Sequence, residues 1–579
     1  MLFEAFREMR RSRPQAAAFY VAAGDRALPI SWKRFTDDIE AIAYLIETRT
    51  PGATIALLGE NSYEWITAHV AIMFSGAKVV PLDVNLSAGE IAEMTAFVGA
   101  EVLVHSSLYV DKAKSVSKLR PGMAVHAFGS RQTDLVIEDV KRRLGEGVPG
   151  IFSKPPPDTD SVSMLVFTSG TTLRPRAVRQ TLKAVETCCE VWASRLDMKA
   201  GDHSLMVLPL HHIFGMCAAY LMLSQGVAIG VCPDFRRLYD AVERFRADFL
   251  FLVPALADIL AGKIELRART AAEAFGAPIR WILTGGAPLQ RRTYDRLRAL
   301  GVKSVCAYGL TETASLYSVS PVSDTQHPCC AGKVPVGSGV ETRVAGSGEL
   351  LIRGPNVFKG YYGEKKRTEE VLDKDGWFHT GDVGEIDGEG FVTVKGRISR
   401  TIVLSSGKKI APEELEERLQ SLPGVLESMV CGTGDVREIR AEIYASLPDD
   451  EVRRAVHKLN LQLPTYKRIR DVSFRKKPFP RTASGKIKIA DPGKVKRPSS
   501  VRSFRVGRWR LPIGLSLTLG LASMAVALLT LVPNLLMSNG VVMPKALTRF
   551  FGMLDFAGEV LLVIFAVVYI FKVKSSSEK

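Results

Sequence analysis

The chain has 579 residues, of which 46% are hydrophobic and 24% charged, and its net charge is +16. This length predicts two or three domains rather than one. The positive excess lies in residues 451–510, where aromatic residues that could stack on bases are sparse, so the composition argues against a nucleic-acid partner and favours an anionic membrane surface.

The eight cysteines contain no C-x-x-C pair, which argues against a zinc site. Adjacent and scattered thiols of this kind are typical of reduced proteins in a cytoplasmic compartment. The first residues also lack the long apolar stretch of a signal peptide. We therefore expect the globular part of the chain to be cytoplasmic.

The first 150 residues alternate helix and strand patterns. Residues 32–48 and 63–74 have helical periodicity, and Ser87 with Glu90 forms a capping box that opens another helix. Short apolar runs predict buried strands at 54–58, 78–82 and 101–104. Alternation of this kind predicts a mostly parallel sheet covered by helices.

A hydroxyl-rich turn follows the next predicted strand, residues 164–167. Backbone N–H groups and hydroxyls in such a turn suit a phosphate chain, and Arg176 adds positive charge. The turn is not a Walker P-loop, because it lacks the G-x-x-x-x-G-K-[ST] pattern. The candidate phosphate-binding residues of the turn are Thr168, Ser169, Gly170, Thr171 and Thr172.

Residues 167–178 resemble the phosphate-loop signature of the adenylate-forming (AMP-binding) superfamily, which includes acyl- and aryl-CoA synthetases. The chain departs from that signature at Leu173, Arg176 and Ala177, where the family has Gly, Lys and Gly. Loss of two glycines should stiffen the loop. Arginine in place of lysine keeps the charge but changes its geometry.

The family's other motifs follow in order. Residues 208–215 resemble a stretch in which a histidine, here His212, lines the carboxylate end of the acyl pocket. Strands are predicted at 248–253, 280–283 and 303–307, after helical stretches. Glycines after the second of these strands would let a flat ring approach the backbone. The resemblance implies an adenine-binding turn made by Gly285, Gly286 and Ala287.

Residues 308–312 follow the third of these strands and match another family motif. The resemblance implies that Tyr308 stacks on adenine, Thr311 meets the α-phosphate and Glu312 holds Mg²⁺. A hard carboxylate suits this ion, which neutralises charge as pyrophosphate leaves.

From residue 348 the pattern changes to short apolar runs between glycines, such as 348–354 and 390–396, which predict antiparallel strands. Asp382 matches the family's T-G-D motif, and the resemblance implies that it binds the ribose hydroxyls. Arg397 would bind the ribose from the other side.

A small α+β unit is predicted after residue 396, with a helix at 412–419. The resemblance implies that this unit rotates about a hinge at Ser399, and that Lys486 is the catalytic lysine bridging the substrate carboxylate and the α-phosphate. Residues 401–407 resemble the version of this region in some long-chain fatty acyl-CoA synthetases, which favours a long-chain substrate.

The chain ends in two apolar runs. Residues 511–537 carry no charge and exceed the ~20 residues that cross a bilayer, whereas residues 553–571 contain Asp555 and Glu559. We predict a multi-pass membrane protein with two spans, at about 511–533 and 552–571, and its catalytic domains on the cytoplasmic side. A buried soluble helix is the alternative for each run.

The predicted fold class is α/β: a large N-terminal domain of helix-covered sheets with a β-rich subdomain, then a small α+β C-terminal domain and two transmembrane helices. The predicted boundaries are 1–397 for the large domain, 398–490 for the small mobile domain, 491–510 for a basic linker and 511–571 for the membrane hairpin.

The resemblance implies a two-step ligase that uses ATP, Mg²⁺ and CoA. A carboxylic acid, expected to be a fatty acid delivered from the lipid bilayer, would form an acyl-adenylate and then an acyl-CoA thioester, with release of pyrophosphate and AMP. Transfer to the phosphopantetheine of an acyl carrier protein is one alternative. A non-catalytic membrane-anchored scaffold of the same fold is the other.

Overall fold

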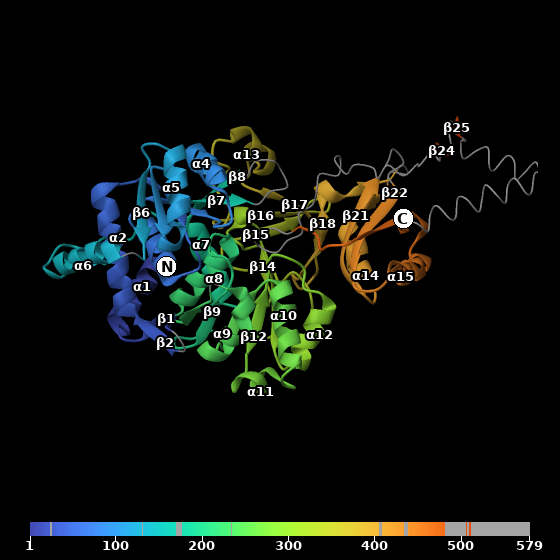
Figure 1. Cartoon of the computed structure of the whole chain (residues 1–579), viewed down its shortest axis with the longest axis horizontal. Coiled ribbons are helices and arrows are strands. Elements are labelled where there is room, and N and C mark those ends of the chain that lie inside the picture. The colour runs from blue at the N-terminus through green and yellow to red at the C-terminus, as the bar shows by residue number, and fades with distance from the viewer. Residues whose placement is uncertain are drawn as a thin grey trace, which may run out of the picture. The chain divides into compact units, whose positions relative to one another are not determined.

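The computed structural model describes residues 1–23, 26–129, 131–168, 176–232, 234–404, 408–433, 438–480, 505–506 and 509–510. The chain forms two compact units, Met1–Pro492 and Gly493–Lys579. In the second unit, β24 (Arg505–Val506) and β25 (Trp509–Arg510) form an antiparallel pair. The candidate site lies in the first unit (Figure 1).

A six-stranded sheet contains the strands predicted in the first 170 residues. Its neighbouring strands are parallel except for the last pair, β7 and β8. The predicted strands 54–58 and 78–82 are confirmed with the same bounds. The order is β6 (Ala124–Phe128), β5 (Val102–Ser106), β3 (Thr54–Leu58), β4 (Lys78–Leu82), β7 (Val162–Thr168) and β8 (Arg176–Thr181).

An eight-stranded sheet is parallel through its centre and antiparallel at both edges. The three strands predicted between residues 248 and 307 are neighbours in it. Its order is β14 (Ser318–Val319), β13 (Lys303–Tyr308), β12 (Trp281–Thr284), β11 (Phe249–Leu252), β9 (His203–Met206), β10 (Ala228–Val231), β1 (Ala17–Ala23) and β2 (Arg26–Ser31).

Helices cover these sheets, as the alternating pattern predicted (Figure 1). The largest hydrophobic core joins residues of both sheets with the buried helices α3, α7 and α8. The predicted capping box is present, because Ser87 and Glu90 exchange hydrogen bonds at the start of α4. The helices of this part are α1 (Leu2–Ser12), α2 (Trp32–Arg49), α3 (Tyr63–Phe74), α4 (Ala88–Phe97), α5 (Val110–Leu119), α6 (Arg131–Gly145), α7 (Leu182–Ala193), α8 (Ile213–Ser224), α9 (Leu238–Phe245), α10 (Pro254–Glu265), α11 (Ala271–Phe275), α12 (Arg291–Ala299) and α13 (Lys365–Val371).

The antiparallel β-rich part predicted after residue 348 is also present. It is a four-stranded sheet of β15 (Glu341–Val344), β16 (Glu349–Arg353), β17 (Phe378–Ile386) and β18 (Val392–Arg397). A three-stranded sheet follows, with two helices, in the predicted α+β pattern. Its elements are α14 (Pro412–Gln420), β21 (Val425–Thr433), β22 (Glu438–Ala445), α15 (Asp449–Gln462) and β23 (Asp471–Arg475), preceded by the short pair β19 (Ile402–Val403) and β20 (Lys409–Ile410).

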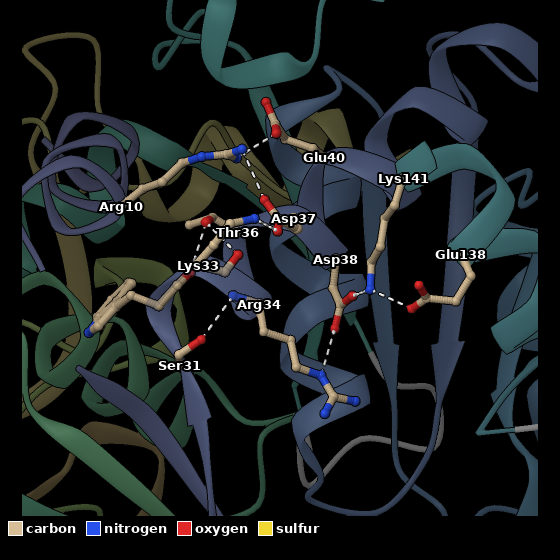
Figure 2. Close-up of polar contacts among 11 residues, drawn as sticks. Arg10, Ser31, Lys33, Arg34, Thr36, Asp37, Asp38, Glu40, Glu138 and Lys141 are labelled. Carbon is tan, nitrogen blue, oxygen red and sulfur yellow. Dashed lines mark hydrogen bonds and ion pairs between the residues drawn. The ribbon is translucent and has the colours of Figure 1, made fainter. Parts of the chain in front are cut away.

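Buried carboxylates of α2 tie three helices together. The Arg10 guanidinium on α1 contacts Asp37 at 2.9 Å and also Glu40. Lys141 on α6 pairs with Asp38. Figure 2 shows these cations pointing at the α2 carboxylates from separate helices. Because the α2 carboxylates are largely buried, these ion pairs stabilise the packing of the three helices and are not mere surface contacts.

The prediction of a multi-pass membrane location is corrected by the structure. In the part of the chain that it describes, no helix is long and apolar enough to cross a membrane. Crossing requires a continuous helix of ~20 residues, and the highly apolar helix α8 has only 12 residues, most of them buried in the core. The predicted spans, 511–533 and 552–571, and most of the predicted linker lie outside the described residues.

Candidate active site

Two antiparallel strands flank the hydroxyl-rich turn in the sequence. Thr168 ends β7, Arg176 begins β8, and the two residues are direct partners across the strand pair. The strands therefore fix the base of the predicted phosphate loop. The loop residues Ser169, Gly170, Thr171 and Thr172 lie outside the described residues.

The predicted adenine turn and Tyr308 lie at one edge of the eight-stranded sheet. Gly285, Gly286 and Ala287 follow β12, and Tyr308 ends the parallel neighbour β13. A Cβ atom on Gly285 would stand 3.2 Å from Cζ of Phe214, so a larger residue would crowd this turn. Carboxyl ends of parallel strands form the usual ligand-binding edge of α/β folds.

Asp382 is held by two side chains, one at each of its carboxylate oxygens. Its Oδ2 accepts a hydrogen bond from the Tyr308 hydroxyl at 2.5 Å, and its Oδ1 lies 2.6 Å from Nε of Arg397. Asp382 is only 3% exposed, whereas the Arg397 side chain is half exposed. Burial, reinforced by the Asp382 charge, raises the pKa of Tyr308, which keeps its hydroxyl a donor. The structure thus brings three predicted ribose and adenine residues together.

A tight turn after β13 carries Thr311 and Glu312. It forms the 3₁₀ helix η4 (Thr311–Thr313) and then reverses through Ala314 and Ser315, whose φ angles are 47° and 66°. A Cβ atom on Gly309 would stand 2.1 Å from the Ser315 carbonyl oxygen. Only glycine therefore lets the turn close on itself.

Glu312 contacts a residue that the sequence did not single out. The Tyr361 hydroxyl donates to Oε1 of Glu312 at 2.8 Å. The Arg176 guanidinium lies 5.7 Å from the centre of the Tyr361 ring. Burial, and then the Glu312 charge, raise the pKa of Tyr361. Tyr361 therefore contacts both Glu312, the predicted metal-binding carboxylate, and Arg176, the predicted phosphate-binding arginine.

Two buried amides, Gln180 and Asn356, hold the backbone of the same turn. The Gln180 amide donates to the Thr311 carbonyl at 2.6 Å. The Asn356 amide donates to the Thr313 and Leu316 carbonyls at 3.2 and 2.8 Å. A polar residue such as Gln180 within a buried strand is the sequence signal that could have found this support.

His212 lies in a different loop, directly before α8. Asn61 fixes that loop, because its amide donates to the Leu208 carbonyl at 2.8 Å and its oxygen accepts from the Leu210 N–H at 3.0 Å. The His211 and His212 rings lie 4.4 Å apart. Burial lowers the pKa of His211, against the opposing effect of Asp83. The acyl-pocket role of His212 stays a prediction.

The predicted hinge residue Ser399 is exposed and lies between two anchored arginines. Arg397 is bound to Asp382 on β17, as described above. Arg400 contacts Glu413 and Glu416 of α14 at 2.7 and 2.6 Å. Lys486 lies outside the described residues, so its catalytic role stays a prediction.

The class of protein is defined by comparison with known families, since an α/β architecture alone does not define a function. Residues 6–362 match the profile of the family described as AMP-binding enzyme, and residues 399–492 match that of the AMP-binding enzyme C-terminal domain. The chain belongs to the AMP-binding enzyme family.

Its relatives include acyl- and aryl-CoA ligases. A feruloyl-CoA synthase of Amycolatopsis is 30% identical over 76% of this chain and 87% of the relative. A long-chain-fatty-acid–CoA ligase of Mycobacterium tuberculosis is 27% identical over 75% and 86%. The fold is similar to that of O-succinylbenzoate CoA synthetase from Bacillus subtilis, solved with ATP and magnesium, at a TM-score of 0.70 and 24% identity over 84% of this chain and 98% of the other.

Proposed function

We propose that the protein joins a carboxylic acid to a thiol in two steps. The acid carboxylate attacks the α-phosphorus of ATP, which forms an acyl-adenylate and releases pyrophosphate. The thiol of CoA then attacks the acyl carbon, which forms a thioester and releases AMP. The observation that carries this proposal is the pair of tyrosine-held carboxylates, Asp382 and Glu312, with Arg176 against the ring of the tyrosine that holds Glu312.

The ribose end of the nucleotide would bind at Asp382. Its carboxylate already accepts one hydroxyl hydrogen bond, from Tyr308, and ribose hydroxyls present the same kind of donor. Arg397, half exposed beside it, would contact the sugar from solvent. Gly285, Gly286 and Ala287 would let the adenine ring lie against the end of β12.

The phosphate end would lie between the β7–β8 strand pair and η4. Arg176 and the hydroxyls of the loop would bind the phosphate oxygens, with Thr311 at the α-phosphate. The half-buried Glu312 fits Mg²⁺, which proteins commonly hold through one or two carboxylates and substrate phosphates. When bound, the ion would neutralise charge that develops as pyrophosphate leaves. Lys486 would bring the acid carboxylate to the α-phosphate despite their like charges.

The acid is proposed to be a fatty acid, with His212 near its carboxylate. The 401–407 pattern and the similarity to a long-chain ligase support this choice. The feruloyl-CoA relative favours an aryl acid as the second candidate. The acceptor is proposed to be CoA, with carrier-protein phosphopantetheine as the alternative.

Exchange of labelled pyrophosphate into ATP, with a panel of fatty and aryl acids, tests the first step directly. We expect exchange that depends on one class of acid. Asp382→Asn should raise the ATP concentration at half-maximal rate roughly 10- to 150-fold, since a hydrogen bond to a charged group contributes ~1.5–3 kcal/mol. Glu389→Gln, on an exposed turn of the same sheet, is the matched control and should leave the rate unchanged.

No exchange with any acid would contradict the proposal and favour a non-catalytic protein of this fold. An unchanged ATP dependence in Asp382→Asn would contradict the placement of the ribose. Supplying CoA or a phosphopantetheine-loaded carrier protein to the preformed adenylate then identifies the acceptor, because only the true acceptor should release AMP rapidly.

A further inference from the structure

Tyr361 contacts both charged groups that the proposed function assigns to the phosphate end of ATP. Its hydroxyl binds Oε1 of Glu312 at 2.8 Å, and the Arg176 guanidinium lies 5.7 Å from its ring centre. Tyr361 itself is 5% exposed. A hydrogen bond in such a shielded position is stronger than one in water, so it can fix a carboxylate that would otherwise rotate.

The backbone around Tyr361 is fixed to the strand that leaves the phosphate loop. Tyr361 forms an antiparallel bridge with Val178 of β8, and the Tyr362 N–H donates to the Ala177 carbonyl at 2.8 Å. The Tyr361 N–H donates to Oγ1 of Thr368 at 2.9 Å. Residues 359–362 therefore extend the six-stranded sheet by a short segment, and any shift of the loop base is transmitted to Tyr361.

The Tyr361 ring is also confined by its neighbours. It packs edge to face against Phe358 with 5.0 Å between ring centres. Because backbone and ring are both held, the direction of the hydroxyl is set before any ligand arrives. Glutamate has several rotatable bonds and loses rotamer freedom when it is ordered. Because the Tyr361 hydroxyl already has a fixed direction, it restricts the Glu312 side chain before the metal binds. Part of the entropy cost of ordering Glu312 is therefore no longer incurred at metal binding.

We propose that Tyr361 is a positioning residue for the adenylation step, fixing the Glu312 carboxylate for Mg²⁺ while its ring packs against Arg176. This inference rests on the proposed function, in which Glu312 holds the metal. One carboxylate oxygen is engaged by the tyrosine, which leaves the other to face the ion.

The test uses Tyr361→Phe in the full chain, which removes the hydroxyl and keeps the ring. Calorimetric titration with a non-hydrolysable ATP analogue is run with Mg²⁺ and with chelator. We expect Mg²⁺ to tighten analogue binding about tenfold less in the variant than in the unaltered protein. Affinity in chelator should be unchanged, and half-saturating Mg²⁺ in pyrophosphate exchange should rise by a similar factor.

Tyr362→Phe is the matched control, because this adjacent tyrosine packs on Phe97 with 5.8 Å between ring centres. It should leave the Mg²⁺ effect unchanged. Equal weakening of analogue binding with and without Mg²⁺ in Tyr361→Phe would mean general damage and would overturn the inference. An unchanged Mg²⁺ effect would overturn it as well.

Glu312→Gln separates this inference from the proposed function. If Glu312→Gln removes the Mg²⁺ effect and Tyr361→Phe does not, the metal assignment stands and the positioning role fails. If Mg²⁺ tightens the analogue equally in Glu312→Gln and the unaltered protein, the metal assignment itself fails, and the positioning role fails with it.

Discussion

His69, a single buried residue outside the site, makes the stability of the protein depend on pH. It lies fully buried on α3, stacked on Trp65 with 4.9 Å between ring centres and hydrogen-bonded to the Tyr220 hydroxyl through Nδ1. Burial lowers the pKa of His69 from 6.5 to about 3. The unfolded chain therefore binds a proton in this range that the folded protein does not, so the free energy of unfolding falls as pH drops below 6.5.

We predict that protonation of His69 in the unfolded chain lowers the free energy of unfolding by about 2 kcal/mol as the pH falls from 6.5 to 4.5. His69→Gln should remove that share of the pH dependence, because glutamine binds no proton when the chain unfolds. Urea unfolding of the two proteins at several pH values measures the difference. His457→Gln, at an exposed position of α15, should keep the original slope. Identical slopes for His69→Gln and the unaltered protein would contradict the account.

Among the secondary-structure elements, the ion pairs between α1 and α2 lead to a prediction about stability. Arg10 neutralises Asp37 and Glu40, and the Glu40 side chain is only 9% exposed (Figure 2). Arg10→Met would leave a buried carboxylate without its cation. We expect a loss of about 2–4 kcal/mol in the free energy of unfolding, since removal of one partner of a buried pair is costly.

The neighbouring Arg11→Met is the matched control for this measurement. Arg11 pairs with Glu8 on the same helix, but both side chains are largely exposed, at 79% and 51%. Exposed pairs contribute ~0–1 kcal/mol, so denaturant unfolding should barely change. If both variants lost the same stability, loss of helix propensity or of surface charge would explain the result better than loss of the buried ion pairs.

At the scale of the whole molecule, we predict that rotation of the small domain takes place at Ile398 and Ser399, which lie between two anchored arginines. Arg397 is bound to β17, and Arg400 is bound to α14. Ser399→Pro fixes the φ angle at position 399, one of the two positions at which we predict rotation. We predict that it changes the ratio of adenylation to thioester formation about tenfold, corresponding to 1.4 kcal/mol in one barrier.

Single-turnover assays of each half-reaction measure that ratio, with preformed adenylate supplied for the second. Ser399→Ala, which leaves φ free, should behave like the unaltered protein. Equal slowing of both half-reactions by Ser399→Pro would place the pivot elsewhere in the chain.

Local patterns predicted most of the large-domain architecture. Strands β3 and β4 were expected with the bounds found, because each ends in an uninterrupted run of four apolar residues, which is typical of a buried strand. The antiparallel edges were missed. Strand β8 reads R-A-V-R-Q-T, and its two arginines hide the strand pattern, although β7 and residues 359–362 pair with it on either side.

Motif order predicted the group formed by Tyr308, Asp382 and Arg397, in which Tyr308 comes from β13 and the other two are partners on β17 and β18. Tyr361 and Gln180 were not predicted, because each acts through a partner far along the chain. The membrane location was inferred from hydropathy and from the basic residues that flank the apolar runs, and it was corrected, since no helix among the described residues is long and apolar enough to cross a membrane.

One edge of β8 can be paired only late in synthesis on the ribosome, and this delay has a consequence for folding. One edge of this strand pairs at once with β7, but the other waits for residues 359–362, roughly 180 residues further on. At typical elongation rates that interval lasts about 10–40 s. During it, the nascent chain presents an open strand edge, which is a template for wrong pairing between chains. Chaperone dependence in the cell would therefore reflect this delay rather than any weakness of the finished fold.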